Sequence, residues 1–266
     1  MTESLPAVGP APSTPTIDPA KFGTARVVSR RDFADGLWVM RVATDFELGY
    51  RPGQYCTLAL PVGDRLIERP YSICSSPEED EIELFIERVP GGELTVPLFE
   101  QRTGADIPVR RRCKGLFLRE APVADQAHLF VATVTGIAPF LSCIRTLVRR
   151  AERGEWTPGG RVVLLHGASI SAELGYLEEM RELTARLDWL EYVPTISRPW
   201  LDPEWPGERG RVEDVVRKHA DRLDLHPGSA SAFICGNPQM IDNVTGALLR
   251  AGFDSASVHQ EQYWPE

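Results

Sequence analysis

The chain has 266 residues, of which 42% are hydrophobic and 25% are charged, a composition typical of globular proteins and not of disordered ones. Its net charge of -9, from 29 basic and 38 acidic residues, argues against a general nucleic-acid-binding protein, which normally carries a basic excess. At about 150 residues per domain, this length predicts two domains.

The amino-terminal segment is rich in proline. Residues 1–20 contain five prolines and neither Lys nor Arg, so they lack the basic start and apolar centre of a signal peptide. We expect them to form a disordered tail. The longest mainly apolar run, residues 129–144, contains Gly, Pro and Thr and is shorter than the ~20 residues that cross a bilayer. We therefore expect no membrane insertion.

The cysteines are widely spaced along the chain. They are Cys56, Cys74, Cys113, Cys143 and Cys235. Zinc ribbons and iron–sulfur centres need closely spaced thiolates, so this pattern predicts no metal in the chain and places any iron–sulfur cluster on a partner. An odd number of cysteines in a chain of this size indicates reduced, mostly buried thiols, as in a cytoplasmic protein.

Short β-rich segments separated by Gly and Pro turns occupy the first half of the chain. The clearest are residues 37–42, 55–60 and 82–86. This spacing predicts an antiparallel β-barrel, which we place at residues 21–121.

After a polar linker at 121–127, apolar strands alternate with longer helical segments, as in a Rossmann-like parallel α/β domain, here predicted for residues 128–266. The expected strands are 129–133, 162–166, 189–196 and 232–235, and the expected helices are 139–153, 172–187 and 238–251. Such sheets bind ligands beyond the carboxyl ends of their strands, where the small-residue turns 133–139 and 235–238 occur.

The segment Arg69-Pro70-Tyr71-Ser72 combines a cation, an aromatic ring and a hydroxyl. These groups suit a flavin cofactor, whose ring stacks on an aromatic side chain and whose phosphates bind the forked donors of a guanidinium. If the segment is a strand, Arg69 and Tyr71 point to one face and Pro70 and Ser72 to the other. The alternative is a half-buried strand with a paired arginine, and four residues alone do not decide between the two.

The order of these motifs resembles that of the ferredoxin–NADP reductases. The flavin-suited segment is followed by a phosphate-suited turn at Gly92-Glu93-Leu94-Thr95, by the two turns of the α/β half, and by the terminal Glu261-Gln262-Tyr263-Trp264. The resemblance covers about residues 22–264 and is strongest to the bacterial branch, whose chains end in an aromatic pair. It implies an FAD-binding β-barrel followed by an NADP-binding domain.

The resemblance also implies which residues bind FAD. Arg69 and Thr95 would contact the pyrophosphate, Tyr71 would stack on one face of the isoalloxazine, and Tyr263 would cover the other face as a gate for the nicotinamide. The implied FAD set is Arg69, Pro70, Tyr71, Ser72, Gly92, Leu94, Thr95, Thr133, Tyr263 and Trp264. The alternative for the terminal aromatic pair is a hydrophobic clasp on the barrel.

The coenzyme residues follow from the same resemblance. Ser197, Arg198 and Arg211 would read the adenosine 2′-phosphate and so select NADP(H) over NAD(H), unless these arginines are ordinary surface charges. The NADP set further includes Thr135, Gly136, Cys235 and Gly236. The implied catalytic set is Ser72, Cys235, Glu261 and Tyr263, which would position groups and supply protons without covalent catalysis.

Two residues of the α/β half depart from the family pattern. Val134 occupies the first glycine of the family's Gly-Thr-Gly-Ile-Ala-Pro turn, although a β-branched residue disfavours positive φ. Ser169 stands where the bacterial branch often has an arginine. Pro265 and Glu266 also extend past the aromatic pair. We expect weaker or altered coenzyme binding, not its absence.

The implied activity is hydride transfer from NADPH to flavin N5, followed by release of single electrons to ferredoxin or flavodoxin, here by a monomer. Such acidic partners need a positive face, for which the candidates are Arg110, Arg111, Arg112 and Lys114, with Arg145, Arg149 and Arg150 at its rim. The alternatives are an ordinary solvated surface for these charges and an FAD contact for Lys114. Two other functions stay open, namely the reductase component of an oxygenase and a non-catalytic flavin-binding module.

Overall fold

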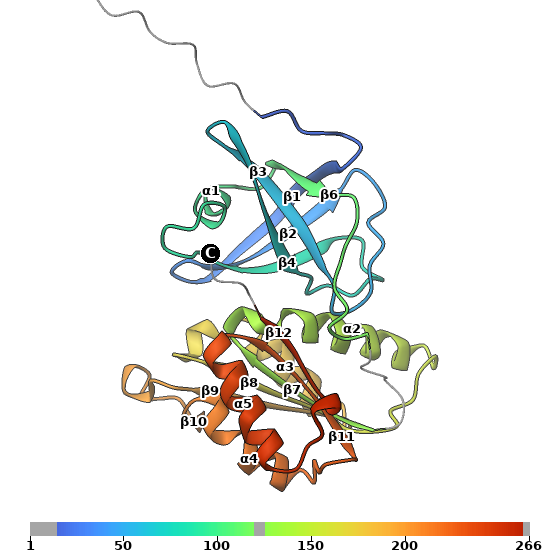
Figure 1. Cartoon of the computed structure of the whole chain (residues 1–266), viewed down its shortest axis with the longest axis vertical. Helices are drawn as coiled ribbons and strands as arrows, with labels where there is room; N and C mark the ends of the chain where they lie inside the picture. Colours follow the sequence, from blue (N-terminus) through green and yellow to red (C-terminus); the bar gives the residue numbers. More distant parts are fainter. Residues whose placement is uncertain (1–14, 120–125, 263–266) are drawn as a thin grey trace, which may run out of the picture.

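The computed structural model describes residues 15–119 and 126–262, which form two sheets stacked along the long axis of the molecule (Figure 1). The first sheet is antiparallel, in the order β4-β3-β6-β1-β2-β5. Its strands are β1 (Phe22–Ala34), β2 (Leu37–Thr44), β3 (Tyr55–Val62), β4 (Arg65–Ser72), β5 (Ile82–Glu87) and β6 (Asp106–Arg110). A bridge between Ile73 and Leu84 joins its two edges, so the sheet closes into the predicted barrel.

The barrel interior is filled by inward-facing side chains of these strands. Trp38 on β2 is fully buried, and its ring meets Phe99 edge-on at 5.1 Å between centroids. Phe99 is the last residue of the short helix α1 (Thr95–Phe99), which packs against the barrel through the buried Leu98. Arg30 on β1 lies over both aromatic rings, which adds cation–π contacts to the apolar packing.

The second sheet is parallel, in the order β10-β9-β8-β7-β11-β12. Its strands are β7 (Ala127–Thr133), β8 (Val162–Ala168), β9 (Leu190–Ile196), β10 (Glu208–Arg209), β11 (Ala230–Gly236) and β12 (Val258–Gln262). Every residue of β8 and β11 is buried, which explains why these strands read as continuous apolar runs without alternation.

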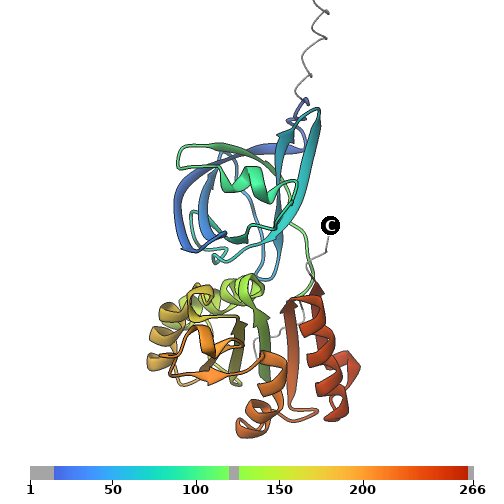
Figure 2. The ribbon, with the colours of Figure 1, turned by 90° about the vertical axis from the view of Figure 1, so that its left-hand side faces the viewer.

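Helices cover both faces of the parallel sheet (Figure 2). They are α2 (Ala138–Glu152), α3 (Leu177–Arg186), α4 (Val212–Arg222) and α5 (Pro238–Arg250). Along β7, Phe130 packs in the cluster formed by α2 and α3, whereas Leu129 and Val131 pack in the cluster formed by α4 and α5. The side chains of β7 thus alternate between two helical layers, as in a doubly wound α/β domain.

The predicted fold class is confirmed, and the predicted strands and helices are present. Helix α4, strand β12 and the short strand β10 were not predicted from the sequence. The helix expected at 172–187 begins only at Leu177, because residues 171–173 form a separate 3₁₀ turn. Residues 1–14 of the expected tail lie outside the described residues, while Ala20 and Pro19 already form hydrogen bonds. No helix in the described ranges has the length and apolar character to cross a membrane.

The barrel and the α/β domain share one hydrophobic cluster. Leu37, Phe85 and Leu118 of the barrel half pack in the same buried group as Phe140 and Phe233 of the α/β half. Helix α2 lies at this boundary (Figure 1). The two halves are therefore joined by core packing, beyond their covalent connection.

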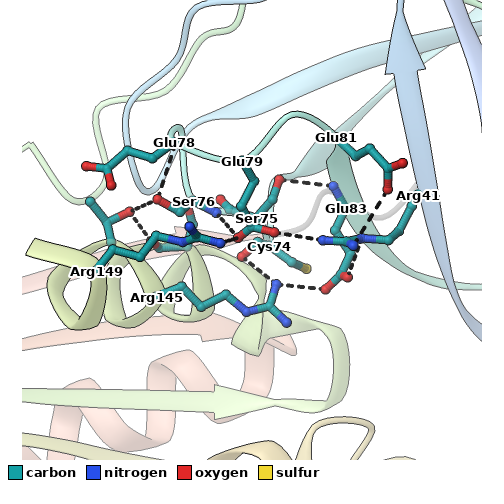
Figure 3. Close-up of polar contacts among 12 residues, drawn as sticks. Arg41, Cys74, Ser75, Ser76, Glu78, Glu79, Glu81, Glu83, Arg145 and Arg149 are labelled. Atoms are coloured by element: carbon teal, nitrogen blue, oxygen red, sulfur yellow. Dashed lines mark hydrogen bonds and ion pairs between the residues drawn. The ribbon is translucent and has the colours of Figure 1, made fainter. Parts of the chain in front are cut away.

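A buried ionic network crosses the same boundary (Figure 3). The carboxylate of Glu83 on β5 is 2.8 Å from Nη1 of Arg145 on α2 and 3.0 Å from Nε of Arg41 on β2. Tyr176 donates a hydrogen bond to Glu83 at 2.9 Å, and Arg145 also forms a two-bond pair with Glu179 at 2.7 Å. Burial would otherwise penalise these charges, so each is held by an opposite charge.

Arg145 should therefore be essential to the domain interface. Replacing Arg145 with Met leaves Glu83 and Glu179 without their shared cation, and we expect a loss of about 3–5 kcal/mol in the free energy of unfolding. The control is Arg149→Met, one turn further along α2, where the side chain is 43% exposed and 4.0 Å from Glu79. That change should cost under ~1 kcal/mol. Urea unfolding measures both, and equal losses would refute a special role of the buried pair.

Candidate active site

A cleft of about 390 Å³ opens at the carboxyl edge of the parallel sheet. Five of the predicted cofactor residues line it, namely Thr133, Thr135, Ser197, Arg211 and Gly236. They come from the ends of β7, β9 and β11 and the start of α4. The cleft also contains the two departures from the family pattern, Val134 and Ser169. The structure thus gathers at one sheet edge residues that are up to 103 positions apart in sequence.

The floor of the cleft is formed by two turns in backbone contact. A Cβ added to Gly136 would lie 2.3 Å from the carbonyl oxygen of Cys235, and one added to Gly236 would lie 2.2 Å from Oγ1 of Thr133. Thr133 Oγ1 accepts a hydrogen bond from the backbone N–H of Asn237 at 2.9 Å. Only glycine fits at 136 and 236 without moving the turns, so the predicted Gly136 is required beneath the cleft even though it does not line it.

Helix α5 begins at the rim of this cleft. Asn237 caps the helix, and its side-chain oxygen accepts hydrogen bonds from the N–H groups of Gln239 and Met240 at 2.9 and 3.2 Å. Asn237, Pro238 and Met240 all line the cleft. The positive end of the α5 dipole therefore faces the space in which a phosphate group would be bound.

Two of the three predicted readers of the 2′-phosphate, Ser197 and Arg211, are brought together by the loop between β9 and α4. Ser197 follows β9 and is tied to β8 by the hydrogen bond from its N–H to Ala168 at 2.9 Å. The chain returns beside β9 as β10, and Gly210, which follows it with a φ of +125°, donates to Ile196 at 2.9 Å. Arg211 thereby joins Ser197 in the cleft wall, whereas Arg198 is exposed and does not line the cleft.

Two carboxylates share this cleft with Arg211, and the sequence analysis did not select them. Glu213 lies 3.7 Å from the guanidinium of Arg211. Glu87 reaches the cleft from the end of β5 in the barrel, and burial, with Glu173 nearby, raises its pKa. No local sequence signal marks Glu87, because its place in the cleft depends on how the barrel packs against the α/β domain.

The flavin-suited segment is the edge strand β4 of the barrel. Arg69, Tyr71 and Ser72 face Leu58, Cys56 and Tyr55 across the ladder with β3. Ser72 is buried, Pro70 is exposed, and Tyr71 is half-buried against the barrel core. The predicted strand is therefore present. Its burial does not follow the expected two faces, because Pro70 is exposed whereas Ser72, expected on the same face, is buried.

The phosphate-suited turn at 92–95 lies beside this strand. Glu93 in the turn approaches Arg69 to 3.4 Å and is also paired with Arg65. Two guanidinium groups therefore lie beside this turn, and guanidinium groups form charge-assisted hydrogen bonds with phosphate oxygens. The hydroxyl of Thr95 accepts a hydrogen bond from Val89 N–H at 3.1 Å, which ties the turn to the end of the preceding loop. Leu94 is fully buried. A Cβ added to Gly92 would lie 2.3 Å from Thr95 Oγ1, so a larger residue would not fit there without moving the turn.

The loop after β4 is anchored on helix α2. Ser142 donates a hydrogen bond to the carbonyl oxygen of Ser75 at 2.7 Å, and the hydroxyls of Ser76 and Thr146 are 2.9 Å apart. Tyr50 of the barrel donates to Ser76 at 2.8 Å. These bonds set the loop after β4 against the α/β domain, and Figure 3 shows Ser75 and Ser76 of this loop beside helix α2.

Cys235 and Glu261 are neighbours on adjacent strands, as Cα partners in the β11–β12 ladder. Cys235 is fully buried in the cluster shared by the two domains. Oε2 of Glu261 is buried with no hydrogen-bond partner among the described residues, and burial raises the pKa of this carboxyl to about 7. A carboxyl poised near neutral pH is suited to proton transfer. The remaining candidates, Tyr263 and Trp264, lie outside the described residues.

The expected docking cations differ in whether they are already bonded to other groups of the protein. Arg110 is paired with Glu68, and Arg111 donates to the carbonyl oxygen of Pro19 at 3.0 Å and lies over Phe46. Arg112 and Lys114 are exposed and form no ion pair within the part of the chain that the structure describes.

The rim proposed around these cations needs one correction. Arg145 was expected on an exposed rim, but its side chain is only 15% exposed and is held in the domain interface. This expectation was wrong because α2 turns Arg145 toward the barrel. Arg149 and Arg150 are more exposed and lie near Glu79 and Glu78.

Comparisons with known proteins identify the class. Residues 26–115 match the model of the oxidoreductase FAD-binding domain, and residues 130–246 match that of the oxidoreductase NAD-binding domain. The chain is 31% identical over 218 residues to ferredoxin–NADP reductase B of Sorangium cellulosum, covering 80% of this chain and 85% of that one. The chain therefore belongs to the ferredoxin–NADP reductase family, with an FAD-binding domain followed by an NAD(P)-binding domain.

The same family contains larger relatives. The chain is 30% identical to the reductase component of phenol 2-monooxygenase from Pseudomonas sp. (strain CF600) over 85% of its own length, but it spans only 61% of that protein. Among solved structures, a ferredoxin NADP+ reductase from Neisseria gonorrhoeae with bound FAD and NADP matches with a TM-score of 0.80 at 22% identity, covering 92% of this chain and 99% of that one. This likeness shows a shared fold.

The buried carboxyl of Glu261 predicts a pH-dependent stability. Its folded pKa of about 7 lies above the value of 4.5 for an exposed carboxyl. The stabilising contribution of the neutral buried carboxyl to the free energy of unfolding is therefore fully present below pH 4.5 and is lost as the pH rises through 7. Glu261→Gln cannot ionise, so its stability relative to the native chain should increase between pH 5 and pH 8. Urea unfolding at several pH values measures this. The exposed control Glu204→Gln should show no such trend, and a flat profile for Glu261→Gln would contradict the burial argument.

Proposed function

We propose that this chain is an FAD-dependent reductase that moves electrons between NADP(H) and a one-electron carrier. The proposal assigns residues 21–121 to the FAD-binding half and residues 128–266 to the NADP-binding half. The main supporting observation is the cleft that gathers Thr135, Ser197, Arg211 and Gly236 at one sheet edge, next to the barrel. Family membership supports the same chemistry.

When bound, FAD supplies the conversion between two-electron hydride chemistry and one-electron transfer. In this proposal Arg69 and the turn at 92–95 hold its diphosphate, with Thr95 acting mainly by shaping that turn. Tyr71 and Ser72 position the ring at the end of β4. Cys235 orients the nicotinamide, and Glu261 holds a proton at its buried carboxyl near neutral pH. Tyr263 and Trp264 complete the proposed flavin site.

Selection of NADP(H) over NAD(H) is assigned to Ser197, Arg198 and Arg211. Arg211 and Ser197 already share the cleft wall, and a 2′-phosphate there accepts charge-assisted hydrogen bonds from a guanidinium and a hydroxyl. Arg198 follows Ser197 directly and is exposed, so in this proposal its side chain turns toward bound coenzyme. Glu213, at 3.7 Å from Arg211, is its competing partner when no phosphate is bound.

The proposed electron carrier is ferredoxin or flavodoxin, docking on the exposed cations Arg112 and Lys114. A second candidate is an oxygenase component, which is favoured by the 30% identity to a phenol 2-monooxygenase reductase component. We further propose a monomer in the cytoplasm. The cytoplasmic assignment is supported by the odd number and wide spacing of the cysteines in the sequence.

Removing either arginine should weaken NADPH binding selectively. We expect Arg211→Ala and Arg198→Ala each to lower kcat/KM for NADPH by about 10–100-fold, because each removes a charge-assisted contact of about 1.5–3 kcal/mol. The value for NADH, which has no 2′-phosphate, should change by less than about threefold. Arg217→Ala, an exposed cation on α4 outside the cleft, is the control. Equal losses for the two coenzymes would exclude a 2′-phosphate contact.

The whole proposal is tested by an anaerobic titration of the FAD-loaded chain. Addition of NADPH should bleach the visible flavin bands much faster than addition of NADH. Reduced protein should then pass electrons to ferredoxin or flavodoxin, with a rate that falls as salt is raised. Bound flavin that neither coenzyme reduces would favour the non-catalytic module instead. Reduction without transfer to either carrier would favour the oxygenase component.

A further inference from the structure

Val134 adopts a backbone conformation that its side chain disfavours. Its φ is +45°, in the left-handed region that glycine normally occupies. A β-branched residue in this conformation is disfavoured on the order of tenfold or more relative to glycine. Val134 occupies a position at which the family pattern has glycine. In the structure this valine adopts the left-handed conformation that a glycine would adopt there. Other contacts must therefore hold it.

A buried histidine bonds the strained residue directly. Nε2 of His166 on β8 is 2.9 Å from the carbonyl oxygen of Val134, and Nδ1 of the same ring is 3.1 Å from the hydroxyl of Tyr192 on β9. Because a carbonyl oxygen only accepts hydrogen bonds, Nε2 must carry the proton. Nδ1 of the neutral ring then accepts from the tyrosine hydroxyl. The directions of both bonds are thus determined.

The surroundings keep this arrangement fixed. His166 is fully buried, and burial lowers its pKa to about 4, so the ring stays neutral at physiological pH. Burial likewise raises the pKa of Tyr192, which keeps the hydroxyl as a donor. The side chain of Val134 packs against two hydrophobic clusters, one shared with the barrel and one containing Ile196 and Trp205. Val134 is thus held by its backbone oxygen and by its side chain.

The held residue belongs to the floor of the cleft. Val134 lies between Thr133, which bonds Asn237, and Gly136, which touches the backbone of Cys235. A change in the conformation of residue 134 would move Thr133 and Thr135 relative to the turn at 235–237. The shape of the cleft floor therefore depends on the bond between His166 and Val134.

We propose that His166 and Tyr192 are positioning residues, which hold Val134 in its left-handed conformation and so preorganise the turn that receives the coenzyme. This inference rests on the proposed function, since it takes the cleft as the coenzyme site. Neither side chain lines the cleft, so both act through the backbone of residue 134. The contacts of His166 with Val134 and Tyr192, called the clamp below, stabilise a conformation that glycine would adopt without such support.

A double-mutant cycle between positions 134 and 166 tests the clamp. His166→Leu removes the donor, and in the native background it should raise the Kd for NADP+ about tenfold, the factor by which the left-handed conformation is disfavoured. In the Val134→Gly background, where that conformation needs no support, the same change should raise Kd by less than about twofold. Titration of the FAD-loaded protein with NADP+ measures all four values.

His166→Gln is the matched control, because its amide N–H reaches about where Nε2 lies. It should restore Kd to within about threefold of the native value. Tyr192→Phe should weaken binding less than His166→Leu, since it removes only the group that orients the ring. Equal Kd losses for His166→Leu in both backgrounds, or no rescue by Gln, would overturn the proposal.

A second measurement separates this inference from the proposed function. The same four proteins are unfolded in urea without coenzyme, where the two changes should be non-additive by about a tenfold factor in the unfolding equilibrium constant. If no protein binds NADP+ but the urea data are non-additive, the proposed function fails and the clamp stands. Additive urea data would overturn the clamp, whatever the coenzyme results.

Discussion

The arrangement of this protein depends on the buried contact between Glu83 of the barrel and Arg145 of helix α2. An FAD-binding domain and an NAD(P)-binding domain can exchange electrons between their cofactors only if the two domains are held in a fixed relative position. Apolar packing alone gives adhesion with little directional preference, whereas a buried ion pair with additional hydrogen bonds is satisfied in one geometry. The hydroxyl contacts between the loop after β4 and α2 act in the same direction. The ion pair and the hydroxyl contacts together fix the position of the barrel relative to the α/β domain.

Within the α/β domain, the shape of the cleft depends on the close approach of the backbone turns that follow β7 and β11. Gly136 and Gly236 allow the ends of β7 and β11 to touch, which exposes their turns to the same ligand space. Val134 shows that a position of this kind does not have to be glycine. Its unfavourable conformation is offset by a hydrogen bond from His166 and by burial of its side chain, so the strain is compensated by neighbours in the fold.

Charge is distributed unevenly over a chain that is acidic as a whole. Many of the cations expected to meet ligands or partners are already engaged within the protein, such as Arg110 with Glu68. Within residues 15–119 and 126–262, the ion pair of Arg211 is with Glu213 at 3.7 Å, and Arg211 is 68% exposed. Arginines of this second kind are available for a phosphate, because solvent-exposed pairs are weak and exchange readily. Burial raises the pKa of Glu261, whose Oε2 has no hydrogen-bond partner among the described residues, because an apolar environment favours the neutral carboxyl.

The sequence by itself determined the two-domain architecture, the strands with strong apolar or alternating patterns, and the turns at Gly92, Gly136 and Gly236. These features depend on local periodicity and on close approaches that only glycine allows. The sequence did not reveal α4, whose valines disfavour a helix locally until they are buried against the sheet. Only the tertiary structure decided that Arg145 faces inward, that Glu87 reaches the cleft, and that His166 supports Val134. Those roles depend on side chains from separate elements meeting in space, and no local pattern in the sequence encodes such distances.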